Sequence, residues 1–163
     1  MYKAIDNRHK NKELNASKVG HSEREIEFHN ICCIGNIDDV KCMLLLENKG
    51  YGKINIHIDN EEIFASVCGH ARKDIAQFLL SLEDSHGKIN LSPCSRKIMI
   101  NACISGNFNI VLWLVSLGGI NIKDMADDLF QLTCHAGHLE ITQWIYSFGI
   151  VNIKKYGRNI MLK

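Results

Sequence analysis

The sequence predicts an all-α fold, a solenoid of about four helix-turn-helix units joined by short extended connectors. A sixteen-residue pattern occurs twice, 31 residues apart, as CISGNFNIVLWLVSLG from Cys103 and CHAGHLEITQWIYSFG from Cys134. Two weaker copies precede it, starting at Cys32 and Cys68. Apolar residues within each copy recur at helical spacing, and recurrence at a period of 31 to 36 residues marks a repeated supersecondary unit.

The first helix of each unit is predicted from a bulky apolar residue and a cysteine four positions later. This spacing puts both side chains on one helical face. A small residue three positions after the cysteine predicts a tight turn. The bulky residues are Phe28, Phe64, Met99 and Phe130, and the small residues are Gly35, Ala71, Gly106 and Gly137.

The second helix of each unit is predicted from three apolar positions, each three residues after the one before. We expect these positions and the four cysteines of the pattern to form one continuous core. The three positions hold Val40, Ala76, Val111 and Thr142, then Met43, Leu79, Leu114 and Ile145, then Leu46, Leu82, Leu117 and Phe148.

An asparagine followed by an aliphatic residue predicts a short extended connector after each unit, at Asn55, Asn90, Asn121 and Asn152. The predicted units cover about 22–56, 57–91, 92–122 and 123–152. Residues 1–21 are polar and are expected to be either disordered or a partial cap. Residues 153–163 begin a truncated fifth unit.

Two places leave alternatives open. In the second unit Gly69 and His70 precede the aligned position, so either Ala71-Arg72 forms the turn or the helix pair is shifted by two residues. At the C-terminus we expect Ile160–Leu162 to fold back as a partial cap on the fourth unit. The alternatives are pairing with another molecule and truncation of a longer array.

Two segments resemble the ankyrin signature. Phe28-His29, Cys32 and Gly35-Asn36 are similar to its LHxAAxxGH part, and AGHLEI at 136–141 is similar to GHxEIV. The resemblance covers about residues 22–160 and is greatest to ankyrin-repeat proteins of giant DNA viruses of amoebae. It implies a module that binds a protein, here a host protein, in the host cytoplasm or nucleus. No unit keeps the full Thr-Pro-Leu-His, so we expect a soft stack.

Composition argues against several classes of protein. Nineteen basic and 18 acidic residues give a net charge of +1, which disfavours a dedicated nucleic-acid binder. No apolar run is long enough to span a membrane. Seven cysteines without a recognisable signal peptide favour free thiols in a reducing compartment, the cytosol or the nucleus.

No catalytic motif is recognisable, so we expect neither enzyme activity nor a cofactor nor a metal. Cysteines one repeat apart lie roughly 10 Å from each other, too far to share a zinc ion. The adjacent acids Asp38-Asp39, Glu61-Glu62 and Asp127-Asp128 are interpreted as helix starts, where the helix dipole favours negative charge.

Other side chains have interpretations of their own. His29 and His138 are expected to be structural, whereas His57 and His86 are candidate contact residues. Cys42 and Cys94 are the cysteines expected to be exposed and reactive. Packing between helices is expected for Trp113 and Trp144.

The function predicted is binding of a protein partner through the concave surface and the connector tips. Insertions in repeat proteins gather on one face, and the first two units carry polar ones at 47–53 and 83–88. A monomer is expected, with self-association through the weakly capped C-terminal end. The alternatives are a ubiquitin-ligase adaptor, a decayed repeat copy without a partner and a nucleic-acid binder. The candidate contact residues are Asp59, Asn60, Glu62, Ser95, Arg96, Lys123, Asp124, Asp127, Lys154 and Lys155.

Overall fold

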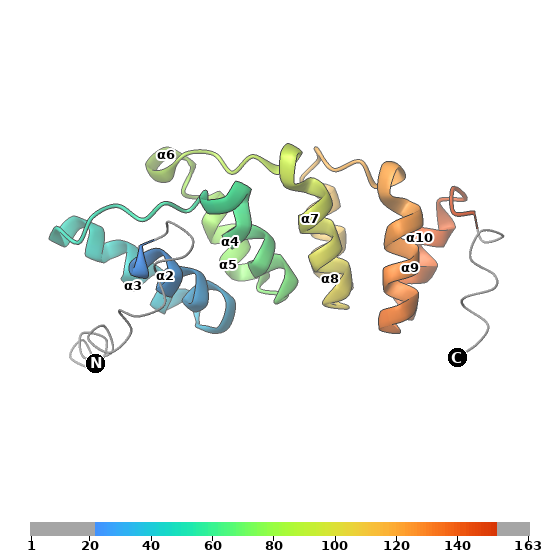
Figure 1. Ribbon diagram of the computed structural model, residues 1–163, viewed down its shortest axis with the longest axis horizontal. Helices are drawn as coiled ribbons and strands as arrows, with labels where there is room; N and C mark the ends of the chain where they lie inside the picture. Colours follow the sequence, from blue (N-terminus) through green and yellow to red (C-terminus); the bar gives the residue numbers. More distant parts are fainter. Residues whose placement is uncertain (1–21, 153–163) are drawn as a thin grey trace.

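The computed structural model describes residues 22–152, and over this range the chain is helical with no β-strand, which confirms the all-α prediction. The helices form two layers (Figure 1). The first layer holds α2 (Glu23–Ile34), α4 (Ile58–Gly69), α7 (Leu91–Ile104) and α9 (Ala126–Ala136). The second holds α3 (Ile37–Leu45), α5 (Lys73–Leu80), α8 (Phe108–Ser116) and α10 (Leu139–Ser147). Between the pairs lie η3 (Leu46–Lys49), α6 (Glu83–His86) and η4 (Ile122–Met125).

The helix pairs follow one another in a row. The helices α2, α4, α7 and α9 contact each other in chain order, and each packs on the second helix of its own pair. The row is extended, with α2 and α10 towards opposite ends (Figure 1). Among the described helices, none combines the length and the apolar character needed to cross a bilayer. The predictions for residues 1–21 and 153–163, including the C-terminal cap, lie outside the described residues.

Side-chain caps begin several of the helices. Ser22 and Glu25 form a capping box at the start of α2, in which the Ser22 amide donates to the Glu25 carboxylate at 2.8 Å. Asn36 and Asn107 accept hydrogen bonds from the backbone N–H three residues on, at 2.9 and 3.3 Å. These caps satisfy amides that have no partner within the helix. The acids at 38–39 and 127–128 lie in first helical turns, as expected.

The turn within the second helix pair lies at the aligned position. Ala71 has φ +56°, in the left-handed region occupied by Gly106 at +72° and Gly137 at +77°. The amides of Ala71 and Gly137 both donate to the cysteine carbonyl three residues before them. Ala71-Arg72 therefore forms the turn, and the two-residue shift is wrong. Gly35 differs, with φ −81°, but a Cβ there would lie 2.6 Å from the Ile31 carbonyl oxygen.

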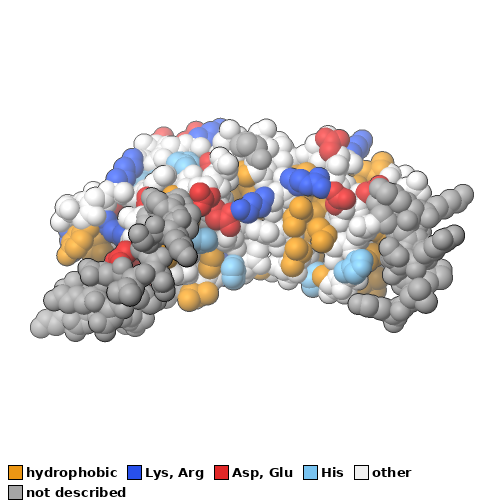
Figure 2. Space-filling view, viewed as in Figure 1, with side chains coloured by type: hydrophobic (Ala, Val, Ile, Leu, Met, Phe, Trp, Pro, Cys, Tyr) orange, Lys and Arg blue, Asp and Glu red, His pale blue; other side chains and the backbone are white. Residues whose placement is uncertain are grey.

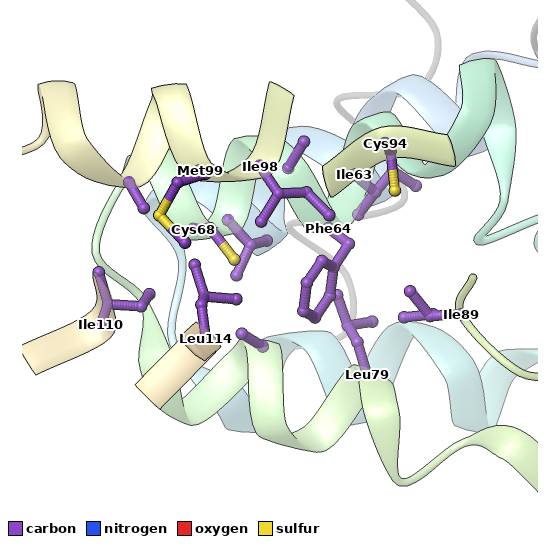
Figure 3. Close-up of a cluster of buried hydrophobic side chains, with 14 of the residues drawn as sticks. Ile63, Phe64, Cys68, Leu79, Ile89, Cys94, Ile98, Met99, Ile110 and Leu114 are labelled. Carbon is purple, nitrogen blue, oxygen red and sulfur yellow. The ribbon is translucent and has the colours of Figure 1, made fainter. Parts of the chain in front are cut away.

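The core lies between the two layers. Phe28, Phe64, Met99 and Phe130 are buried, as are all residues of the first two apolar positions of the second helices. Figure 3 shows Phe64, Cys68 and Met99 from the first layer facing Leu79 and Leu114 from the second. The helical periodicity therefore identified the buried face of each helix.

The third apolar position of the second helices is less buried than expected. Leu46 and Leu82 are half-buried, and Leu117 and Phe148 are exposed. Leu46, Leu117 and Phe148 are the C-terminal cap residues of α3, α8 and α10, so each stands at the end of its second-layer helix.

The seven cysteines are free thiols, and their burial differs from the prediction at three positions, Cys42, Cys94 and Cys134. Cys32, Cys68 and Cys103 are buried, but Cys134 is half-buried. Cys134 belongs to α9, the last first-layer helix of the described part, so no further described helix covers it. Cys94, expected to be exposed, is buried, and its thiol donates to the Asn90 carbonyl at 3.0 Å at the start of α7. Cys42 is half-buried.

Candidate functional site

The candidate site is the outer face of the first-layer helices together with the connectors that precede them. Figure 2 shows acidic and basic side chains close together over the middle of this face. Of the predicted contact residues, the structure exposes Asp59, Asn60, Arg96, Lys123 and Asp124, and half-buries Glu62, Ser95 and Asp127. Lys154 and Lys155 lie outside the described residues.

Ion pairs join neighbouring helices across this face. Lys97 of α7 pairs with Glu62 of α4, and Arg96 of α7 pairs with Asp128 of α9. Arg96 and Asp128 are about half exposed, so the free energy of their pair is small, about 0–1 kcal/mol. The Arg96–Asp128 pair therefore contributes little to the stability of the fold. Sequence reasoning missed Lys97 and Asp128, whose partners lie about one repeat away.

The start of α4 has an unusual backbone. Asp59, Asn60 and Glu61 have φ values of +46°, +54° and +66°, all left-handed, although none is glycine. Asp and Asn tolerate this region better than most residues, yet the conformation costs roughly 1–2 kcal/mol for each residue. It points Asp59 and Asn60 to solvent and buries Glu61.

Glu61 stabilises this turn. Its carboxylate lies 2.9 Å from His57 Nδ1 and accepts the Asn90 amide at 3.1 Å. The interpretation of Glu61 as a simple helix-start acid is therefore incomplete, because the carboxylate is buried and links two connectors. One sequence signal could have found it: Glu25, Glu61 and Asp127 each stand three residues before the bulky residue of the repeat.

Those three acids have a common role. Each accepts the backbone amide of the asparagine that begins the next connector: Glu25 from Asn55 at 3.3 Å, Glu61 from Asn90 at 3.1 Å and Asp127 from Asn152 at 3.2 Å. In the third unit Arg96 takes this position and pairs with Asp128 instead. Asp127, predicted as a contact residue, is therefore already bound to the backbone.

Two histidines, His57 and His86, have a different role from the one predicted. His138 donates from Nε2 to the Ile104 carbonyl at 2.8 Å, which is the backbone role expected of it. His29 is half-buried, and its pKa is lowered by burial and by the nearby charges of His70 and Lys97. His57 and His86 are not free contact residues, because both rings bind residues of the connectors. Sequence reasoning could not place these partners, which are 29 and 39 residues away.

Aromatic packing occupies the second layer. The Trp144 ring lies 5.6 Å from the Phe108 ring and 4.9 Å from the Phe148 ring, both edge to face. Lys73 lies over the Trp113 ring. Trp113 and Trp144 both pack partly buried against the core, as predicted.

Burial keeps three of the thiols in their unreactive, protonated form. Burial raises the pKa of Cys32, Cys68 and Cys103 to about 12, so these groups stay protonated near neutral pH. Within the described range, no three His, Cys, Asp or Glu side chains are arranged to hold a metal ion. What this face presents is a patterned set of charges on neighbouring helices.

Comparison with known proteins adds no relative: no family model, curated protein or solved structure matches the chain.

Proposed function

We propose that this chain is an ankyrin-repeat protein that binds a partner protein through the outer face of α2, α4, α7 and α9 and the connectors before them. The repeat spacing, the helix-turn-helix pairs and the extended asparagine connectors support this assignment. The observation that carries the proposal is that four first-layer helices contact each other in chain order and carry charged side chains that face one another across α4, α7 and α9. Stacked repeats use extended surfaces of this kind for binding.

The charges suggest the chemistry of the partner. The sign of the charge alternates from helix to helix. It is negative at Glu62 of α4, positive at Arg96 and Lys97 of α7, and negative at Asp128 of α9. A partner with both acidic and basic groups fits this pattern better than a polyanion, because a polyanion needs one dominant sign of charge. We therefore propose a folded protein or a polar peptide of mixed charge as the ligand.

A matched pair of charge-reversal variants tests the proposal. The double variant Arg96→Glu/Lys97→Glu reverses two charges on the proposed face. The control Lys41→Glu/Lys73→Glu makes the same change in net charge on α3 and α5 of the other layer. Each purified chain is immobilised and exposed to amoebal lysate, the source that the viral resemblance suggests, and the retained proteins are identified.

The proposal is supported if one protein binds the unmodified chain and the control but is lost from the Arg96→Glu/Lys97→Glu variant, with purified partner then giving at least a tenfold weaker affinity. Equal retention by both variants, or no reproducible partner, contradicts it. Retention of ubiquitin-ligase subunits would favour the adaptor function instead. Urea unfolding of each variant shows that the bait is folded.

A further inference from the structure

The connector before α4 contains a histidine whose two ring nitrogens both face hydrogen-bond acceptors. His57 Nδ1 lies 2.9 Å from both carboxylate oxygens of Glu61, and Nε2 lies 2.9 Å from the backbone carbonyl oxygen of His86. A carboxylate and a carbonyl only accept, so each contact needs an N–H on the ring. Neutral imidazole has one N–H, and only the imidazolium ion makes both bonds.

His86, in the same network, does not make this demand. Its Nε2 lies 3.0 Å from the Glu47 carboxylate and its Nδ1 lies 2.8 Å from the Ser85 hydroxyl. The Ser85 hydroxyl also lies 3.1 Å from the Leu82 carbonyl oxygen, and when it turns its one proton to Nδ1 instead, a neutral His86 ring with its proton on Nε2 satisfies both contacts. His57 differs because neither of its two acceptors can donate, so both of its contacts need an N–H on the ring.

The surroundings of His57 favour that proton. Partial burial lowers the pKa of His57, but the hydrogen bonds to Glu61 and the His86 carbonyl and the negative charge of Glu61 outweigh it and raise the pKa above its ordinary value of 6.5. The other charged or titratable groups around this contact are Glu47, the ring of His86, Lys53, which donates to the Ser85 carbonyl, and the thiol of Cys94, which faces Glu61.

We propose that protonated His57 is a clasp that holds the loop of residues 83–90, which contains α6, against the first turn of α4. When the proton is lost, the remaining N–H stays on Nδ1, because an Nδ1 lone pair facing the Glu61 carboxylate is the worse alternative. The Nε2 lone pair then faces the His86 carbonyl, and that bond is lost. The loop keeps its contacts with Glu47 and Lys53 and the bond from the Asn90 backbone amide to Glu61, but it loses the bond between the His86 carbonyl and His57.

The direction of the pH dependence follows from the raised pKa. The clasp contributes fully to stability below pH 6.5, the ordinary value, and its contribution is lost as pH rises through the higher pKa of the folded protein. The loop of residues 83–90 is one of the two polar insertions beside the proposed binding face. The part of that face next to this loop would therefore change with pH. This consequence rests on the proposed function, but the clasp does not rest on it.

The direct test is an NMR titration of the full chain, labelled with ¹³C and ¹⁵N. The ring C–H signals of His57 report its protonation. The amide of Gly87 reports the loop, since a Cβ at Gly87 would lie 3.4 Å from His57 Nε2. We expect a His57 midpoint above 6.5 and a Gly87 amide that shifts with the same midpoint. A midpoint at or below 6.5, or a Gly87 signal that does not follow His57, overturns the proposal.

Two variants separate the clasp from a general effect of losing a histidine. His57→Gln keeps a donor but cannot carry the charge. His135→Gln is the control, because His135 is an exposed α9 residue whose Nδ1 binds the Gln131 carbonyl at 2.8 Å. We expect His57→Gln to abolish the Gly87 transition and to lower the folding equilibrium constant roughly tenfold at about pH 6 but little at about pH 9. His135→Gln should change neither.

An equal loss of stability at both pH values would contradict the clasp, because it would show that protonation of His57 has no part in the contact. If His57→Gln does not fold, the titration of the unmodified chain decides the question alone. Neither measurement uses a partner protein. A failure of the clasp is therefore distinguishable from a failure of the proposed function.

Discussion

Replacing the turn glycines by alanine probes both the left-handed backbone and the contact between helix pairs. Gly106 and Gly137 occupy the same turn position, with φ +72° and +77°. A Cβ on Gly137 meets no atom within 4 Å, whereas a Cβ on Gly106 would lie 2.4 to 3.0 Å from the ring of His138. The two substitutions share the same backbone cost and differ in one contact.

The magnitudes follow from these distances. A left-handed alanine costs about 1–2 kcal/mol, of which about 0.4–1 kcal/mol is recovered because alanine restricts the unfolded chain. Gly137→Ala should therefore destabilise by about 1 kcal/mol. Gly106→Ala must also displace the His138 ring, which loses its 2.8 Å hydrogen bond to the Ile104 carbonyl. That loss adds about 1 kcal/mol, for a total of about 2 kcal/mol.

Urea unfolding followed by circular dichroism measures both changes. Ala71→Gly should change the free energy of unfolding in the opposite direction. It removes the strain of an alanine at φ +56° and should stabilise the protein by up to about 1 kcal/mol. Equal destabilisation by Gly106→Ala and Gly137→Ala would refute the contact with His138. Destabilisation by Ala71→Gly would refute the left-handed turn at the second helix pair.

Three further predictions address the core, the thiols and the buried carboxylate. Phe64→Ala should cost about 3–5 kcal/mol in urea unfolding, because the ring is fully buried, and Lys123→Ala less than about 0.5 kcal/mol; similar losses would show that the register is wrong. Thiol labelling of the native protein at neutral pH should modify Cys134 well before three of the buried thiols, Cys32, Cys68 and Cys103. Equal labelling rates would contradict the burial of these three. Glu61→Gln should destabilise the protein by about 1.5–3 kcal/mol below pH 6.5 and by less at higher pH, because His57 then loses its proton. Urea unfolding at several pH values measures this, and a loss of stability that does not change with pH would contradict the ion pair.

Much of the architecture was predictable because its causes are local in the sequence. The spacing of Phe64, Cys68 and Leu79 identifies which side of each helix is apolar, and burial of that side follows wherever helices pack. The turn at Ala71 was predictable from alignment with Gly106, even though alanine is a poor residue for that backbone. The predicted burial of Leu117 was wrong, because periodicity identifies the apolar side of a helix but not how far the neighbouring layer covers it.

The candidate site was less predictable. Asp59, Asn60 and Arg96 were identified as surface residues, but the sequence did not show that Arg96 pairs with Asp128 or that Asp127 binds a backbone amide. Such pairs depend on how far one helix is displaced along the next. Their free energies are also small, so they leave little trace in the choice of residue types.

The sequence by itself determined the helical class, the helix-turn-helix pairing and the apolar face of each helix, because hydrophobic spacing and turn chemistry act over a few residues. Only the tertiary structure decided that Glu61 is buried, that His57 needs protons on both ring nitrogens and that Cys134 lacks cover. The contact of His57 joins it to His86, 29 residues further along the chain, and only the packing of the helix pairs brings the two within 3 Å. The exposure of Cys134 depends on which helix lies beside α9.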